Sequence, residues 1–255
     1  MCTVVVLRRP DHKWPLILAA NRDEMSTRPW KPPARHWPDR ADVVAGLDVE
    51  AGGTWLGIND TGVIAGVLNR RGSLGRDAKL RSRGELALEA LDHADAVDAA
   101  GALGRLDGRS WRSFNMVIAD NRDAFWIKSL GPSGNGKVSV AEIPEGLHML
   151  TSGELDDPAS GRITTYLPKF RAAAAPDPDT GDWRGWEALL AAHGAGPESP
   201  DDARERSMCV VTETGFGTLS SSLIALPSIH ALGTNPVWRF AAGRPGETPY
   251  ESVAL

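Results

Sequence analysis

The stretch MCTVVVLRRPDHKWPLILAANRDE, residues 1–24, holds two short apolar runs that lead into four polar residues. The runs Thr3–Arg8 and Pro15–Ala20 are separated by a Pro-Asp-His-Lys turn, so the pattern predicts a β-hairpin. We expect its second strand to end at the NRDE segment (21–24), beside the beginning of the first strand. The hairpin therefore predicts that Cys2 and these polar residues are neighbours in space.

Cys2 is a candidate nucleophile because of its place in the chain. Met1 is normally removed when a small residue follows it, and its removal leaves the thiol and a free α-amine on the same carbon of Cys2. Ordinary pKa values are about 8.5 for a thiol and about 7.7–8.0 for an α-amine, so the amine can accept the thiol proton near neutral pH. The alternative is that Cys2 is a small apolar residue of the core.

Length, charge and cysteine usage limit the class of protein. The chain has 255 residues, and we expect one domain over 1–255. Its formal net charge of −5 does not favour a nucleic-acid-binding protein, for which a basic domain is expected. We expect neither a signal peptide nor a membrane span, because no apolar run is long enough for either. Two cysteines, Cys2 and Cys209, make a poor disulfide framework, so we predict a cytoplasmic protein in which Cys209 packs in the core. The alternative is a Cys2–Cys209 bridge, which would remove the nucleophile.

Strand patterns gather early in the chain and helical patterns follow. Ser82 and Glu85 form a capping-box pattern that predicts a helix start, and the segments 28–40 and 194–206 are typical of loops. Grouped strands and helices favour an α+β fold over a parallel βαβ sheet. Besides the hairpin, we expect strands at 54–58, 63–68, 114–119, 124–129, 148–152, 208–212 and 217–226, and further helices at 161–175 and 183–193.

Several motifs in this order resemble one known family. They are Cys2, NRDE (21–24), EAGGTWLGIND (50–60), SRGEL (82–86) and FNMVIAD (114–120). Together they resemble the NRDE family, which includes the transport and Golgi organisation protein 2 of animals, from Cys2 to about Leu226. The resemblance implies the N-terminal nucleophile hydrolase fold, a four-layer αββα sandwich of two antiparallel sheets flanked by helices.

The resemblance and the chemistry of the residues together indicate an active site around Cys2. The chain is distantly similar to choloylglycine hydrolases and penicillin V acylases, whose mature chains begin with Cys, and Asn21-x-Asp23 fits the spacing of an Asn and an Asp in them. Arg22 is assigned from chemistry alone, as a cation that favours thiolate. Asp23 would orient the ammonium or the arginine, with Asn21 and Glu24 as structural support. The alternative is an Arg22–Asp23 salt bridge that closes the hairpin.

An acyl-transfer site also needs hydrogen-bond donors for the oxyanion. Asn69, at the end of AGVLN, resembles an Asn of the choloylglycine hydrolases, although an Asn before Arg-Arg-Gly also suits a turn. Ser152 stands where those hydrolases carry a second Asn, and Leu219 stands where NRDE relatives commonly carry Arg. The predicted catalytic set is therefore Cys2, Arg22, Asp23, Asn69 and Ser152.

Two classes of function follow from these residues. The first is a Cys-dependent hydrolase of non-peptide amide bonds, which acts on a small-molecule substrate and requires no cofactor. The second is a non-catalytic haem- or acyl-lipid-binding protein on the same fold, because the family has been linked to haem trafficking and lipid metabolism. The six His are scattered and no Cys-x-x-Cys-His motif is present, so a haem would depend on a single weak ligand. No metal-ligand cluster is expected.

Overall fold

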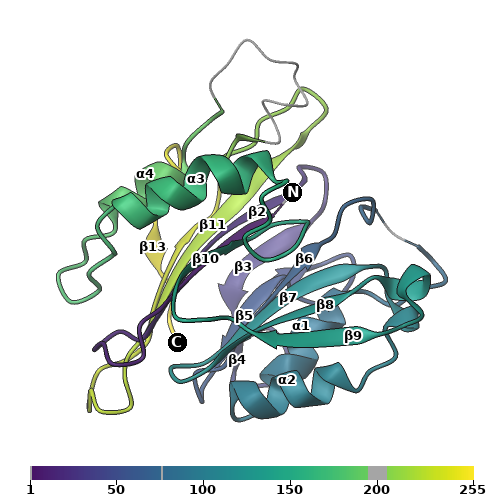
Figure 1. The fold of residues 1–255 in the computed structure, drawn as a ribbon, viewed down its shortest axis with the longest axis horizontal. Helices are drawn as coiled ribbons and strands as arrows, with labels where there is room; N and C mark the ends of the chain where they lie inside the picture. The colour runs from purple at the N-terminus through teal and green to yellow at the C-terminus, as the bar shows by residue number, and fades with distance from the viewer. Residues whose placement is uncertain (1, 76, 195–205) are drawn as a thin grey trace. The chain divides into compact units, whose positions relative to one another are not determined.

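The computed structural model describes residues 2–75, 77–194 and 206–255, and the chain divides into two compact units (Figure 1). The first unit comprises Met1–Thr27 and Glu145–Val253, and the second comprises Arg28–Pro144 with Ala254–Leu255. Each unit is built on one antiparallel sheet. The single domain expected over 1–255 stays a prediction.

The first unit's sheet has, among the described residues, six strands in the order β10-β1-β2-β11-β12-β13. All six residues of β1 are buried, which explains why its sequence TVVVLR lacks the polar alternation of a half-exposed strand. The strands are β1 (Thr3–Arg8), β2 (Leu16–Met25), β10 (Gly146–Leu150), β11 (Phe216–Leu226), β12 (Val237–Ala241) and β13 (Glu251–Ser252).

Two helices, α3 (Gly161–Ala172) and α4 (Arg184–Leu190), lie along one face of this sheet (Figure 1). The α3 helix begins at an N-cap, Ser160, whose hydroxyl accepts a hydrogen bond from the N–H of Ile163. Its buried side chains recur at helical spacing and pack with Trp183 and Trp186, at the N-cap and in the first turn of α4, and with alternate residues of β1, β2 and β11. This face of the sheet is called the helix face below.

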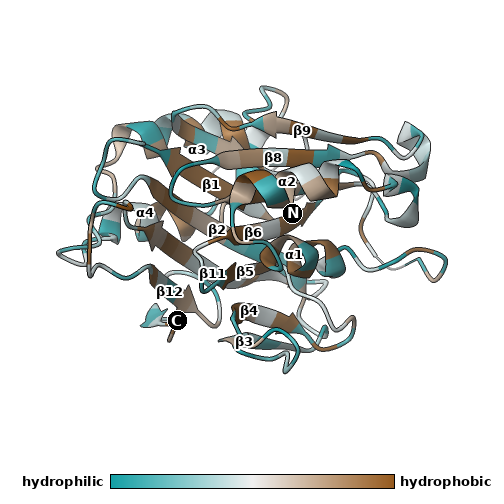
Figure 2. Cartoon of the chain, turned by 90° about the horizontal axis from the view of Figure 1, so that it is seen from below, coloured by the Kyte–Doolittle hydropathy of each residue, from teal (hydrophilic) through white to brown (hydrophobic). Residues whose placement is uncertain are grey.

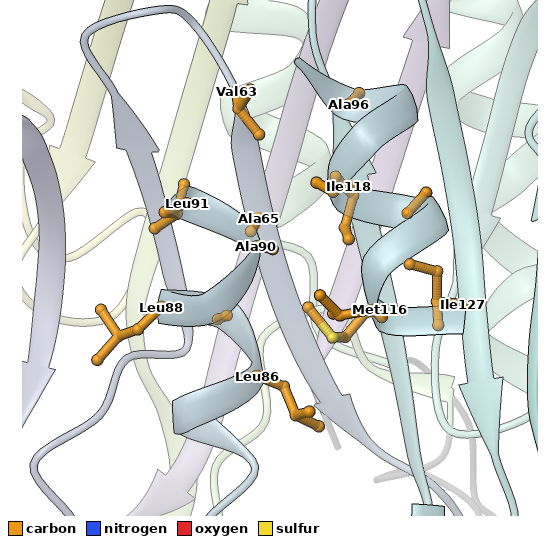
Figure 3. Close-up of a cluster of buried hydrophobic side chains, with 14 of the residues drawn as sticks. Val63, Ala65, Leu86, Leu88, Ala90, Leu91, Ala96, Met116, Ile118 and Ile127 are labelled. Atoms are coloured by element: carbon orange, nitrogen blue, oxygen red, sulfur yellow. The ribbon is translucent and has the colours of Figure 1, made fainter. Parts of the chain in front are cut away.

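The second unit's sheet has, within the described ranges, seven strands in the order β3-β4-β5-β6-β7-β8-β9. Figure 3 shows apolar side chains of two helices and of the strands β6, β7 and β8 forming one buried cluster. The elements are β3 (Trp30–Ala34), β4 (Val43–Asp48), β5 (Leu56–Asn59), β6 (Ile64–Asn69), α1 (Gly84–Leu91), α2 (Ala96–Gly104), η1 (Gly108–Ser110), β7 (Phe114–Ala119), β8 (Ala124–Ser129), η2 (Gly131–Gly134) and β9 (Val138–Glu142).

Three expected elements differ from the structure. The strand expected to end at Ala20 continues through NRDE to Met25, because the whole of β2 pairs with β11. The loop expected at 28–40 contains β3, whose Pro32 and Pro33 are tolerated because β3 lies at the edge of its sheet. The strand expected at 208–212 is absent from the described residues 206–212, where only Val211 makes an isolated bridge to Gly217.

Helix boundaries differ in smaller ways. The helix predicted from Ser82 exists as α1, but its N-cap is Arg83, which makes no side-chain capping bond, and Glu85 pairs with Arg81 instead. The helix α2 was not predicted, because its sequence AVDAAGALG has no clear polar face. The strands β4, β9, β12 and β13 were not predicted either, and most of the predicted loop 194–206 lies outside the described residues.

Figure 2 shows that the strands of both units are rich in hydrophobic residues, whereas loops and outer helix surfaces are more polar. The described residues include no helix that is both long enough and apolar enough to pass through a lipid bilayer. The cytoplasmic location stays a prediction.

Candidate active site around Cys2

The Cys2 thiol lies against the main chain of Asp23. The Asp23 N–H donates to Cys2 Sγ at 3.4 Å, and Sγ lies 3.6 Å from the Asp23 carbonyl oxygen. The pairing of Thr3 with Asn21 in the hairpin produces this approach, because Cys2 directly precedes β1. The predicted closeness of Cys2 to the NRDE segment is therefore present in the structure.

The Asp23 side chain extends to the helix face and is fully buried. Its Oδ1 accepts a hydrogen bond of 2.6 Å from the Thr218 hydroxyl, and its Oδ2 lies 3.4 Å from Nη1 of Arg162. The same Nη1 donates to the hydroxyl of Thr3 at 2.7 Å. A buried carboxylate requires partners of this kind, because an uncompensated charge is costly to remove from water.

Arg162 is a residue of the site that the sequence analysis missed. It is the second residue of α3, and this end of the helix lies beside the N-terminal end of β1 (Figure 1). A signal was present, because Arg162 precedes the buried Tyr166 by four residues and so occupies the apolar stripe of the helix. A charged residue in such a stripe indicates a buried partner, which here is Asp23.

Arg22 lies on the opposite face of the sheet from Asp23, since successive strand residues alternate. Continuing the β1–β2 register by one pair aligns Arg22 with Cys2, so the two share a face. Arg22 is 6% exposed, and its charge lowers the pKa of the Cys2 thiol. The structure therefore brings Arg22 to the face of the sheet that carries Cys2, and it pairs Asp23 with Arg162 on the other face.

The net shift of the Cys2 pKa is upward. Burial of the thiol is the main cause, and the negative charge of Asp23 adds to it. The hydrogen bond with the Asp23 main chain and the charge of Arg22 act in the opposite direction. Burial also raises the pKa of Cys209, which is 1% exposed, in agreement with its expected place in the core.

Ser152 lies in the loop after β10, two residues beyond Leu150, and β10 pairs with β1 on the side away from β2. The last pair of β1 and β10 joins Val4 to Leu150, which are two residues from Cys2 and two residues from Ser152 respectively. Ser152 is 4% exposed. Cys2 and Ser152 therefore leave the same end of the β1–β10 pair, and the orientation of Ser152 toward Cys2 stays a prediction.

Leu219 is the extra residue of a β-bulge in β11. Thr218 pairs with Asp23 and Ser220 pairs with Arg22, so Leu219 has no partner of its own in β2. The bulge thus falls beside the NRDE segment. It allows Thr218 to reach the Asp23 carboxylate on the helix face while Ser220 stays opposite Arg22.

Asn69 belongs to the second unit. It is the last residue of β6 and pairs with Phe114 of β7. Its proposed approach to Cys2 stays a prediction.

The remaining NRDE residues make structural contacts. The Asn21 amide donates to the carbonyl oxygens of Leu190 and Met208 at 2.9 Å each, and its Oδ1 accepts from Ser221 at 2.7 Å. Asn21 therefore connects β2 to the end of α4, to the segment around Met208 and to β11. The Glu24 carboxylate accepts from the N–H of Met25, which is a local contact.

The motifs in the second unit also have structural roles. The Asn59 amide donates to the carbonyls of Leu91 and His93 at the end of α1. The Asp120 carboxylate accepts from the N–H of Ala96 at the start of α2 and from the turn between β7 and β8. These contacts give the motifs a structural role inside the second unit.

The fold is that of known N-terminal nucleophile hydrolases. The chain is similar to an N-acylethanolamine-hydrolyzing acid amidase ortholog of Caenorhabditis elegans (TM-score 0.58, 13% identity, 88% of this chain and 92% of that one). It is also similar to penicillin V acylase from Agrobacterium tumefaciens (TM-score 0.53, 12% identity, 100% and 98%). A conjugated bile acid hydrolase from Clostridium perfringens has a TM-score of 0.53 at 12% identity, over 100% and 92%. At these identities the likeness shows the fold, and the predicted α+β class of two antiparallel sheets with helices is confirmed.

Relatives at higher identity carry a different name. The transport and Golgi organization protein 2 homologs of Homo sapiens and Bos taurus are 39% and 40% identical over 110 and 111 residues. Each match covers 41% of this chain and 38% of the relative, so the chain spans well under half the length of these relatives. The family model for transport and Golgi organisation 2 matches residues 1–226. The chain therefore belongs to the transport and Golgi organisation 2 family, as its NRDE-type motifs predicted.

Proposed function

We propose that the chain is a Cys-dependent hydrolase of non-peptide amide bonds that uses Cys2 as an N-terminal nucleophile. The observation that carries the proposal is the contact of the Cys2 thiol with the Asp23 main chain, on the strand that also carries Arg22. Ser152 follows β10 by two residues, at the end of the β1–β10 pair from which Cys2 also leaves. The fold supports it, because the similar solved structures include an acid amidase, an acylase and a bile acid hydrolase.

The reaction proceeds through a thioester. The sulfur attacks the amide carbon, and the thiol proton passes to the α-amine of Cys2 and then to the leaving amine as the C–N bond breaks. Water then attacks the thioester, which releases the carboxylic acid and returns the thiol. Arg22 favours the thiolate, the Asp23 N–H donates to the sulfur, and Ser152 with Asn69 receives the oxyanion.

Removal of Met1 activates the nucleophile in this mechanism. Met1 lies outside the described residues, and while it is present the nitrogen of Cys2 is an amide without basic character. Trimming converts that nitrogen to an amine, and its protonated form favours thiolate against the burial that raises the pKa of Cys2. We expect the intact mass of the purified protein to lack Met1, and a cellular protein that retains Met1 would contradict the mechanism.

The test combines turnover with identification of the modified residue. The protein is incubated with a panel of N-acylated amines and separately with a thiol-reactive probe, and the N-terminal peptide is analysed by mass spectrometry. We expect an acyl adduct on Cys2, free amine as product, and loss of turnover in Cys2→Ser. The matched control is Cys209→Ser, which removes the other thiol in the chain and leaves turnover unchanged.

The outcome also separates the hydrolase from a binding protein. A Cys2 that reacts no faster than Cys209, without release of amine from any member of the panel, contradicts the hydrolase. A spectral titration with haem and a binding assay with acyl lipids, made on the same sample, would then test the non-catalytic alternative.

A further inference from the structure

The loop that follows β10 carries Ser152 and folds back onto β10 through Asp156. The N–H of Asp156 donates to the carbonyl oxygen of Met149 at 2.9 Å, and the N–H of Met149 donates to Oδ1 of Asp156 at 2.7 Å. Both polar main-chain groups of Met149, on the edge strand of the sheet, are therefore occupied by one residue. The chain from 149 to 156 is closed into a ring that contains Ser152.

The second carboxylate oxygen of Asp156 completes the closure. Oδ2 lies 2.7 Å from Nδ1 of His148, and the two side chains are 27% and 13% exposed. Asp156 has a φ of +53°, a left-handed conformation that L-residues other than Asn and Asp seldom adopt. A strained residue with three hydrogen-bonded contacts to one short stretch of β10 indicates a position that the surrounding structure maintains.

We propose that the His148–Asp156 pair is a positioning device that holds the loop so that Ser152 faces Cys2. The inference rests on the proposed hydrolase and adds two residues to it that act through Ser152 and do not touch the reacting atoms. Protonated His148 binds the Asp156 carboxylate more strongly than neutral His148 does, so its charge controls how firmly the loop is held.

The charges around the pair determine the direction of the pH effect. The hydrogen bond to Asp156 raises the pKa of His148, and its Nε2 lies 3.3 Å from the carbonyl oxygen of Glu145. Arg171 on α3 lies 4.0 Å from Oδ2 of Asp156, and its charge lowers the pKa of His148. Burial acts to raise the pKa of Asp156, but its hydrogen bonds lower it overall.

The raised pKa of His148 determines how the hold on the loop changes with pH. Below the raised pKa of His148 the pair is ionic and the loop is held firmly. As the pH rises through that pKa the imidazolium charge is lost, so the hold on the loop weakens. The placement of Ser152 is therefore expected to deteriorate on the alkaline side of the His148 titration.

The experiment compares two reactions of Cys2 on the mature full chain. Acylation by p-nitrophenyl acetate passes through a tetrahedral oxyanion, whereas alkylation by iodoacetamide does not, so the ratio of their rates cancels the thiolate fraction. Asp156→Asn suits this test, because Asn tolerates the left-handed backbone. We expect the acylation-to-alkylation ratio to fall about tenfold, within the roughly 100- to 1000-fold limit for loss of an oxyanion donor.

Two further variants make the result specific. His148→Asn keeps an uncharged N–H donor near the position of Nδ1. In the wild type we expect the acylation-to-alkylation ratio to decline as the pH rises from about 6 to about 9, and in His148→Asn we expect this decline to be absent. Asp179→Asn removes a carboxylate bound to Lys13 elsewhere in the first unit and should keep the wild-type ratio and pH profile.

The outcomes separate this inference from the proposed hydrolase. A wild-type Cys2 that is alkylated but never acylated overturns both. A wild-type Cys2 that is acylated, together with an unchanged ratio in a folded Asp156→Asn protein, overturns the positioning role alone. A His148→Asn protein that keeps the wild-type pH profile also overturns the positioning role alone.

Discussion

Asp23 uses its main chain and its side chain for different purposes. The main chain contacts the Cys2 sulfur, while the carboxylate extends to the helix face and binds Thr218 and Arg162. In the NRDE motif, Arg22 therefore lies on the face of the sheet that carries Cys2. Asn21 and Asp23 lie on the helix face, where their side chains hold β2 in place. An Asp at this place affects Cys2 through the position of its N–H as well as through its charge.

We predict that the single substitution Arg162→Met strongly destabilises the protein. Arg162 is 3% exposed and the side chain of its partner Asp23 is fully buried, so the substitution removes a buried cation from beside a buried carboxylate. Breaking a buried pair in this way costs about 3–5 kcal/mol. Urea unfolding, followed by circular dichroism, measures the change.

Two controls accompany the Arg162 variant. The double substitution Asp23→Asn/Arg162→Met removes both charges and should recover part of the lost stability. Arg184→Met removes an arginine whose side chain is 86% exposed and pairs with Asp182 on the surface, so the unfolding midpoint should not move. Equal losses in Arg162→Met and Arg184→Met would show that the buried pair contributes nothing particular.

Among the elements, β2 shows what local sequence can and cannot predict. The apolar runs predicted the hairpin, and the hairpin placed Cys2 beside NRDE. The partners of Asp23 lie 139 and 195 residues away along the chain, so no local pattern relates them. The extension of β2 through NRDE depends on the same distant pairing with β11, which is why the strand was expected to end too early.

The motifs GGTW and SRGEL meet where α1 begins. The N–H of Thr54 donates to the carbonyl oxygen of Gly84 at 3.2 Å, and a Cβ added to Gly53 would lie 2.6 Å from the carbonyl carbon of Gly84. We therefore predict that Gly53→Ala destabilises the protein by about 1–3 kcal/mol, because main chain cannot move aside as a flexible side chain can. Thermal unfolding measures the effect.

Gly101→Ala is the matched control for this substitution. Gly101 lies inside α2, where an added Cβ would come no closer than 3.7 Å to the flexible side chain of Arg105. Alanine is favoured over glycine in a helix, so a gain of about 0.5–1 kcal/mol is expected. A Gly53→Ala protein as stable as the wild type would show that the two motifs separate without cost.

In the molecule as a whole, the second unit's sheet keeps the chain order of its strands, whereas the first unit's sheet joins strands from distant parts of the chain. The first unit takes β1 and β2 from the N-terminus and β10 to β13 from the second half, while residues 28–144 form the other unit. The family resemblance predicted the fold, because the motifs belong to a family whose members share it. Residue patterns alone predicted α+β layering and most strands, but not which distant strands pair.

The last prediction concerns a fragment that contains only residues 145–255. In the full chain, β1 and β2 lie between β10 and β11, so this fragment would lack the strands that join its two edges. It would also expose the apolar faces of α3 and α4 that pack on β1 and β2. We expect the fragment to show little stable structure, with no amide of β11 protected from hydrogen exchange, whereas the full chain protects those amides. Co-expression of residues 1–27 supplies the missing strands and should restore part of the protection. A fragment that protects β11 without them would show that β10 to β13 fold independently of the segment that carries Cys2.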